Sequence, residues 1–153
     1  DTLFANQVQA YESLSDGLKD TLATLNIICR PDKAVAMATR ADRIAERERD
    51  TSKDNLVGIH PVIRTHPETG KKALYVNPAH SCHFEGWSIA ESEGLLEFLY
   101  AHQIKEEFQC RHVWKKGDLA IWDNRCTLHY PVNDYHGHRR LLHRITLKGD
   151  IPV

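Results

Sequence analysis

Paired cysteines are missing from this sequence of 153 residues. Its four cysteines are scattered along the chain, and no two of them form a Cys-x-x-Cys pair. Zinc ribbons and disulfide scaffolds are built from closely spaced cysteines, so the sequence disfavours both classes. Isolated cysteines are typical of reduced thiols, which predicts a cytoplasmic protein.

Long apolar runs and an excess of one charge are missing as well. The longest apolar stretches, such as residues 25–29, are far shorter than the roughly 18 residues that a membrane span requires. No basic-then-apolar signal segment opens the chain. The net charge is −1, with both signs interspersed, which predicts neither a nucleic-acid-binding face nor a membrane patch. These features indicate one soluble α+β domain.

The sequence also lacks an initiator methionine. It begins with DTLFANQVQAYESLS and enters an amphipathic pattern almost at once. Such a start is typical of a chain taken from a longer one. We therefore expect residues 1–153 to form a single domain that is incomplete.

Apolar spacing predicts the elements of the first third of the chain. Residues 2–5 suggest a short strand, and large apolar residues then recur every three or four positions across residues 8–25, which predicts one helix with a buried stripe. Residues 30–55 follow as a charged insert without a core face. We interpret this insert as a solvated, mobile connection rather than an exposed helix supported by charge pairs.

Beyond Gly58 the pattern changes to that of β-structure. Residues 60–78 contain two strand-like runs around the turn sequence PETG, which predicts a hairpin. Ser88 and Glu91 have the spacing of a capping box and precede a helix. Residues 108–114, 118–123 and 141–149 are three further strand candidates. Together these elements predict a double-sheet, mainly β architecture with helices on one side.

Histidine and arginine gather near the end of the chain. His129 follows LAIWDNRCTL, so a strand could aim it into a cavity; an ordinary polar surface residue is the alternative. Arg140 and Arg144 would share one face of the alternating run RLLHRITL, residues 140–147, if it forms a strand. Two neighbouring guanidiniums are costly to bury unless anions meet them, and their planar forks suit a carboxylate or sulfonate. Exposed edge arginines would need no ligand.

These segments resemble a known family. HPVIRTHPETGKKALYVNP, GDLAIWDNRCTLHY and NDYHGHRRLLHRITLKGD are similar to the taurine dioxygenase family of Fe(II)- and 2-oxoglutarate-dependent dioxygenases. The segment DTLFANQVQAYESLS resembles the one that follows this family's first metal-binding region. The resemblance covers nearly the whole chain except about residues 30–55. It implies the C-terminal part of a double-stranded β-helix, or jelly roll, with packing helices.

The resemblance also implies roles for individual residues. His129 would be the distal histidine of a two-histidine, one-carboxylate iron site. Arg140 would pair with the far carboxylate of 2-oxoglutarate, and the Thr2 hydroxyl would bond to that same carboxylate. Arg144 would face an anionic substrate. Trp122 and Asp123 are interpreted as builders of the strand and its turn.

One part of the family pattern is absent from the 153 residues. The other two iron ligands come from a His-x-Asp or His-x-Glu pair that lies before the segment matching Asp1, and no His-x-Asp occurs in this sequence. One His-x-Glu is His83 with Glu85, which we interpret as a loop beside the substrate pocket rather than a replacement ligand pair. His80 and His83 either shape the mouth of that pocket or are merely exposed.

The function implied is the hydroxylation of a small anionic substrate, a sulfonate, sulfate ester or carboxylate, by O2 with release of succinate and CO2. The 153 residues alone would be inactive, and a homo-oligomer is left open. Two alternatives stand beside this one. A catalytically incomplete jelly-roll module would bind a small anion without iron, and a structural domain would carry its histidines as surface groups.

Overall fold

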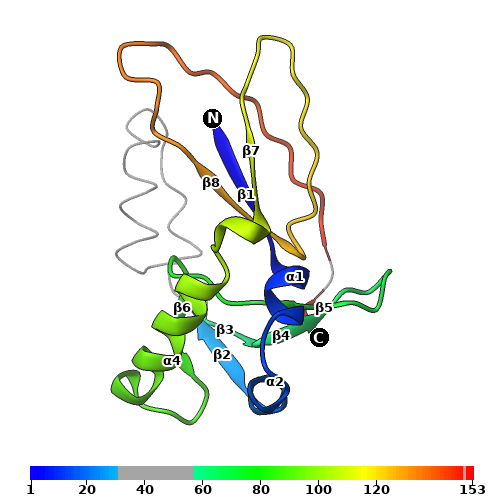
Figure 1. Ribbon diagram of the computed structural model, residues 1–153, viewed down its shortest axis with the longest axis vertical. Helices are drawn as coiled ribbons and strands as arrows, with labels where there is room; N and C mark the ends of the chain where they lie inside the picture. The colour runs from blue at the N-terminus through cyan, green and yellow to red at the C-terminus, as the bar shows by residue number, and fades with distance from the viewer. Residues whose placement is uncertain (31–56, 150) are drawn as a thin grey trace.

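The computed structural model describes residues 1–30, 57–149 and 151–153, so the expected charged insert lies, apart from Arg30, outside the described residues. Figure 1 shows one antiparallel sheet at the N-terminal end of the molecule. Its central strand is β1 (Thr2–Asn6), which lies between β7 (Gln109–His112) and β8 (Thr127–Pro131). The expected strands at 2–5 and 108–114 are therefore confirmed, the second over only part of its length.

A second antiparallel sheet and a hairpin form the other half of the fold. The sheet consists of β3 (Gly58–Pro61), β2 (Asn26–Cys29) and β6 (Ser81–Phe84), with β2 in the centre. The predicted hairpin is confirmed as β4 (Ile63–Thr65) and β5 (Lys72–Leu74), and Gly70 supplies the positive φ of +67° that its turn requires. The loop predicted around His83 is wrong, because these residues pair with β2 as strand β6.

The single helix predicted for residues 8–25 is wrong in one respect. The chain forms two helices, α1 (Gln7–Glu12) and α2 (Asp16–Ala23). The break falls at Ser13, whose hydroxyl donates to the Ala10 carbonyl at 3.0 Å and so competes with the helical backbone. The predicted apolar stripe survives the break, since Leu14 and Leu22 both reach the core.

Helix α4 (Ile89–His102) begins at the predicted capping box. The Ser88 hydroxyl accepts from the Glu91 backbone N–H at 3.2 Å, and the Glu91 carboxylate accepts from the Ser88 N–H at 2.8 Å. These bonds satisfy two of the donors that a helix start leaves open. A 3-10 turn, η2 (Glu106–Phe108), then leads directly into β7.

The hydrophobic core lies between the second sheet, the hairpin and the helices. Helix α4 packs on β6, and α1 packs on β5. Buried aliphatic and aromatic side chains come from the second sheet, the hairpin and the helices: Ala10, Leu22, Ile27, Leu74, Phe84 and Leu99. The sheet formed by β7, β1 and β8 therefore extends from a core that is built mainly by its neighbours. No helix in the described part of the chain is long and apolar enough to cross a membrane.

Two of the predicted strands do not form. Residues 118–123 and 141–149 are irregular, and their large apolar side chains are mostly exposed, as in Ile121 (88%) and Ile145 (90%). Alternating side chains make a segment suitable for a sheet, but a strand exists only where another strand accepts its hydrogen bonds. The predicted placement of Arg140 and Arg144 on one face of a strand is therefore wrong.

The capping box yields a test of the fold. Hydrogen bonds from Ser88 lower the pKa of Glu91, so their stabilising effect is present above the ordinary carboxyl pKa and is lost as the pH falls. We expect Ser88→Ala to lower the free energy of unfolding by about 1 kcal/mol at pH 7. The difference from wild type should shrink at pH 3. Urea unfolding at both pH values measures it, with Glu93→Gln on the same helix as the control; equal stability at pH 7 would contradict the role of the cap.

Candidate active site

His129, Thr2 and Phe4 lie on one face of the first sheet, which we call the β1–β8 face. In the antiparallel pairing of β1 with β8, Phe4 stands opposite His129 and Thr2 stands opposite Pro131. Side chains two residues apart on a strand point to the same side, so Thr2 shares the face of Phe4 and His129. The structure thus brings the predicted iron ligand and the predicted hydroxyl donor to one face.

Thr2 is held in a fixed orientation by an indole. Its side chain is buried, with 4% exposure, and its hydroxyl oxygen accepts a hydrogen bond of 2.8 Å from Nε1 of Trp114. The ring of Trp114 in turn meets the ring of His112 edge-on at 4.5 Å. A hydroxyl that accepts from Trp114 keeps its own proton to donate, which is what a carboxylate ligand would need.

The ring of Trp122 lies between Phe4 and His129 in a chain of aromatic contacts. The ring of Trp122 lies 5.2 Å from the His129 imidazole and 5.1 Å from the Phe4 ring. His129 itself is exposed on its strand. His129 is thus an accessible imidazole on a paired strand, with the Trp122 ring beside it.

The two predicted anion-binding arginines lie in the irregular segment after β8. Arg140 is half-buried, and its guanidinium carbon sits 5.4 Å from the centre of the Tyr135 ring in a cation–π contact. Arg144 is exposed. The predicted roles of Arg140 and Arg144 remain predictions.

Asp123 organises the turn between Trp122 and β8. Its carboxylate accepts from the Arg125 side chain through Nε at 3.0 Å and Nη2 at 2.7 Å, from the Arg125 backbone N–H at 2.8 Å, and lies 3.0 Å from His66 Nε2. Arg125 also contacts Glu68 at 2.9 Å. We call His66, Glu68, Asp123 and Arg125 the Asp123 network. Bonds from Arg125 above all hold the pKa of Asp123 well below its usual range, so this carboxylate is charged.

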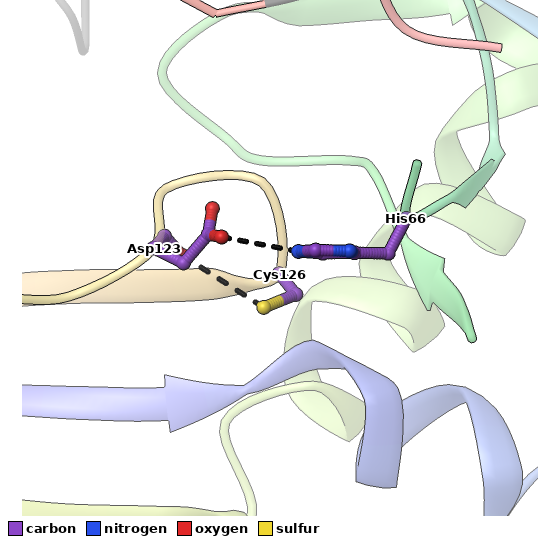
Figure 2. Close-up of side chains that lie close together, drawn as sticks. All are labelled: His66, Asp123 and Cys126. Atoms are coloured by element: carbon purple, nitrogen blue, oxygen red, sulfur yellow. Dashed lines mark hydrogen bonds and ion pairs between the residues drawn. The ribbon is translucent and has the colours of Figure 1, made fainter. Parts of the chain in front are cut away.

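His66, Asp123 and Cys126 converge as Figure 2 shows, and their nitrogen, oxygen and sulfur atoms all lie within 4.8 Å of one another. Zinc accepts such a donor set. The hydrogen bonds favour a different role. His66 Nδ1 accepts from the backbone N–H groups of Glu68 and Thr69, both at 3.3 Å, so the neutral ring carries its proton on Nε2, facing Asp123. The guanidinium of Arg125 also donates hydrogen bonds to the Asp123 carboxylate.

A surface pocket of about 310 Å³ lies beside this cluster. Eight residues line it: Asn6, Val8, Gln9, Glu12, His66, Thr69, Lys71 and Cys126. Neither His129 nor any of the other residues with a family-implied role is among them. The pocket is therefore adjacent to the turn before β8 and separate from the β1–β8 face.

His80 and His83 are both half-buried. His80 Nδ1 lies 3.0 Å from Asn77 Oδ1, and Glu85 accepts a 2.9 Å bond from the Asn26 amide. Within the described ranges the only triad of potential metal ligands is His66, Asp123 and Cys126, so His83 and Glu85 meet no third ligand.

Two residues of this region have no role predicted from the sequence. His66 lies in the predicted hairpin, and Trp114 lies at the end of a predicted strand. The spacing of Asp123 and Arg125 in WDNR was a usable signal, since an acid and a base two residues apart can close a turn. Nothing in the sequence indicated that His66, 57 residues earlier, would be the partner of that turn.

Comparison with known proteins gives the family. The family model described as taurine catabolism dioxygenase TauD, TfdA family matches residues 1–146. The match includes every residue to which a role was assigned. The chain belongs to this family.

Individual relatives agree with the family match. The chain is 35% identical over 160 residues to an alpha-ketoglutarate-dependent sulfate ester dioxygenase of Pseudomonas putida, covering 100% of this chain and 52% of the relative. It is 37% identical over 156 residues to an alpha-ketoglutarate-dependent sulfonate dioxygenase of Saccharomyces cerevisiae, covering 100% of this chain and 36% of the relative. The chain thus spans about half or less of the length of these relatives.

A solved structure is also similar. The crystal structure of a taurine dioxygenase from Burkholderia xenovorans superposes with a TM-score of 0.67 at 35% sequence identity. The superposition covers 84% of this chain and 39% of the other chain. The sheet-rich architecture described above is therefore that of a part of a taurine dioxygenase-like fold.

Proposed function

We propose that this chain is part of an Fe(II)- and 2-oxoglutarate-dependent dioxygenase that hydroxylates a small anionic substrate. The observation that carries the proposal is the family match across residues 1–146, which includes His129, Thr2, Arg140 and Arg144. The proposed fold of the whole protein is a double-stranded β-helix, or jelly roll.

His129 is the proposed iron ligand. Its imidazole is a donor that Fe(II) accepts, it is exposed, and it stands on a strand whose register is fixed by β1. When bound, iron and 2-oxoglutarate would supply the oxidation of a substrate C–H bond by O2, with 2-oxoglutarate leaving as succinate and CO2. The chain's own task is to hold and orient these groups.

Thr2 and Arg140 are the proposed partners of 2-oxoglutarate. The Thr2 hydroxyl accepts one hydrogen bond from Trp114, and its own proton is available for a carboxylate oxygen. Arg140 would pair with that same carboxylate through its planar fork. In the structure its guanidinium rests on Tyr135, a contact that restricts the side chain without neutralising the charge.

Arg144 is the proposed contact for the substrate. The named relatives act on a sulfate ester and on a sulfonate, which share a sulfur-centred anionic group. A guanidinium matches such a group with two parallel hydrogen bonds. The substrate class we propose is therefore a small organic anion of the sulfonate, sulfate ester or carboxylate type.

The isolated 153 residues should not catalyse turnover of substrate. They offer one of three expected iron ligands, and metal affinity depends on the correct ligand number and geometry. We expect neither oxygen consumption nor succinate formation when Fe(II), 2-oxoglutarate and candidate substrates are supplied. The complete protein under the same conditions is the control. Robust turnover by the isolated chain would instead implicate His83 and Glu85 as ligands.

His129→Ala in the complete protein should abolish both iron retention and turnover while the fold persists, because an exposed strand residue is not part of the core. Retained iron, the visible absorption of the iron–2-oxoglutarate complex and the circular dichroism spectrum are the measurements. His138→Ala, which removes an exposed histidine after β8, is the matched control. A normal complex and normal activity in His129→Ala would refute the assignment of the site.

Alanine substitutions of Arg140 and Arg144 should affect different binding steps. Arg140→Ala should weaken 2-oxoglutarate binding by roughly 2–5 kcal/mol, the usual cost of removing one partner of a desolvated charge pair. Arg144→Ala should leave that affinity nearly unchanged and raise KM for an anionic substrate. Lysine at either position should rescue only part of the loss, because a point charge cannot replace a bidentate fork.

Titration with 2-oxoglutarate in the absence of substrate, followed by kinetics with sulfonates and carboxylates, separates the two arginines. Arg139→Ala removes a neighbouring exposed guanidinium and serves as the control. Equal losses of 2-oxoglutarate affinity in both variants would contradict the division of roles. No loss in either variant would favour a module that binds without iron chemistry.

A further inference from the structure

We propose that His66, acting through Asp123, is a positioning residue for His129. This inference rests on the proposed function in that His129 is taken as the iron ligand. His66 touches neither His129 nor any reacting group. Its effect passes through the turn that precedes β8 and through the ring of Trp122.

The first step is the fixed orientation of the His66 ring. The residue follows β4 at the start of the hairpin turn and is only 6% exposed. Backbone N–H groups of Glu68 and Thr69 donate to Nδ1, which directs the proton of Nε2 toward Asp123 Oδ2 at 3.0 Å. A buried ring anchored on both nitrogens makes a rigid donor.

The second step is the closure of the turn. Asp123 Oδ1 accepts from the Arg125 N–H at 2.8 Å, and the Asp123 carbonyl accepts from the Cys126 N–H at 3.3 Å. The guanidinium of Arg125 binds the other edge of the same carboxylate. With both carboxylate oxygens engaged by its own turn, Asp123 transmits the position of His66 to residues 123–126.

The third step joins the turn to the proposed ligand. On one side, the Cys126 carbonyl accepts from the Gln7 N–H at 2.9 Å, which anchors the start of β8 beside the end of β1. On the other side, Trp122 adjoins Asp123 and packs on His129 at 5.2 Å. A movement of the turn therefore shifts the ring that limits the rotation of His129.

The Asp123 network differs from a purely structural one because its members are not part of the hydrophobic core. Asp123 is about one-third exposed, and Glu68 is mostly exposed. Loss of these bonds should loosen Trp122 more than it lowers the stability of the fold. Leu74 offers the opposite case: it is a core residue on the same hairpin, 2% exposed, with no part in the network.

The test compares His66→Ala, His66→Gln and Leu74→Ala in the complete protein. The first readout is the proton NMR shift of the His129 ring without metal, which the nearby Trp122 ring displaces. The second is the dissociation constant for Fe(II). The third is the melting temperature. Glutamine keeps an N–H donor that can reach Asp123, so it tests whether the bond itself matters.

We expect His66→Ala to move the His129 ring signals toward those of an imidazole without a neighbouring indole and to weaken Fe(II) binding by about tenfold, the size seen when an outer partner of a metal ligand is removed. His66→Gln should restore most of both. Leu74→Ala should lower the melting temperature at least as much, with the His129 signals unchanged. Unchanged signals in His66→Ala, or equal shifts in His66→Ala and Leu74→Ala, would overturn the proposal.

A metal bound at His66 itself and a failure of the proposed function would each give a distinct result. A Co(II)–thiolate absorption band that Cys126→Ser abolishes would mean that His66, Asp123 and Cys126 bind a metal, and would overturn the positioning role. If His129→Ala retained iron, the proposed function would fail. The metal-free NMR shift would still show whether His66 orients the ring.

Discussion

Hydrogen bonding on both edges of β1 is the constraint on which the candidate site depends. Because β7 and β8 both pair with β1, the positions of His112 and His129 are set by the register of one short strand. A slip of one residue would turn every side chain of β8 to the opposite face, and His129 would leave the side that carries Thr2. The carbonyl of Cys126 extends this pairing into the turn, so the Asp123 network acts on a strand whose register is already determined.

The fold could be predicted where a pattern is satisfied locally. Ser88 and Glu91 complete their bonds within one turn of α4, and the β4–β5 hairpin closes through its own turn, so both were visible in the sequence. The segments 118–123 and 141–149 carry an equally good alternation of side chains but form no strand. Whether such a segment forms a strand depends on backbone partners elsewhere in the fold, which no local pattern specifies. The short strand β2 was missed for the converse reason, since pairing with β3 and β6 makes it a strand.

The candidate site could also be predicted only where the evidence for a residue is local. The place of His129 after a strand-like run and the family resemblance both indicate this residue, and the assignment of Asp123 to a turn agrees with its bonds to Arg125. The contribution of His66 could not be predicted, because it depends on how the hairpin docks against a turn 57 residues later. Arg140 and Arg144 show that local alternation alone does not place side chains on one face. Their shared face rested on a strand that does not form, so their roles now depend on the family alone.

The exposed side chains of the irregular segments have a consequence for the chain in solution. Leu119, Ile121, Ile145 and Leu147 are each more than 80% accessible to water. Apolar surface of this kind associates with any similar surface it meets. A net charge of −1 provides almost no electrostatic repulsion to oppose that association. Colloidal stability, more than the free energy of folding, therefore sets the concentration at which these 153 residues can be handled, and added acidic residues at these positions would raise it.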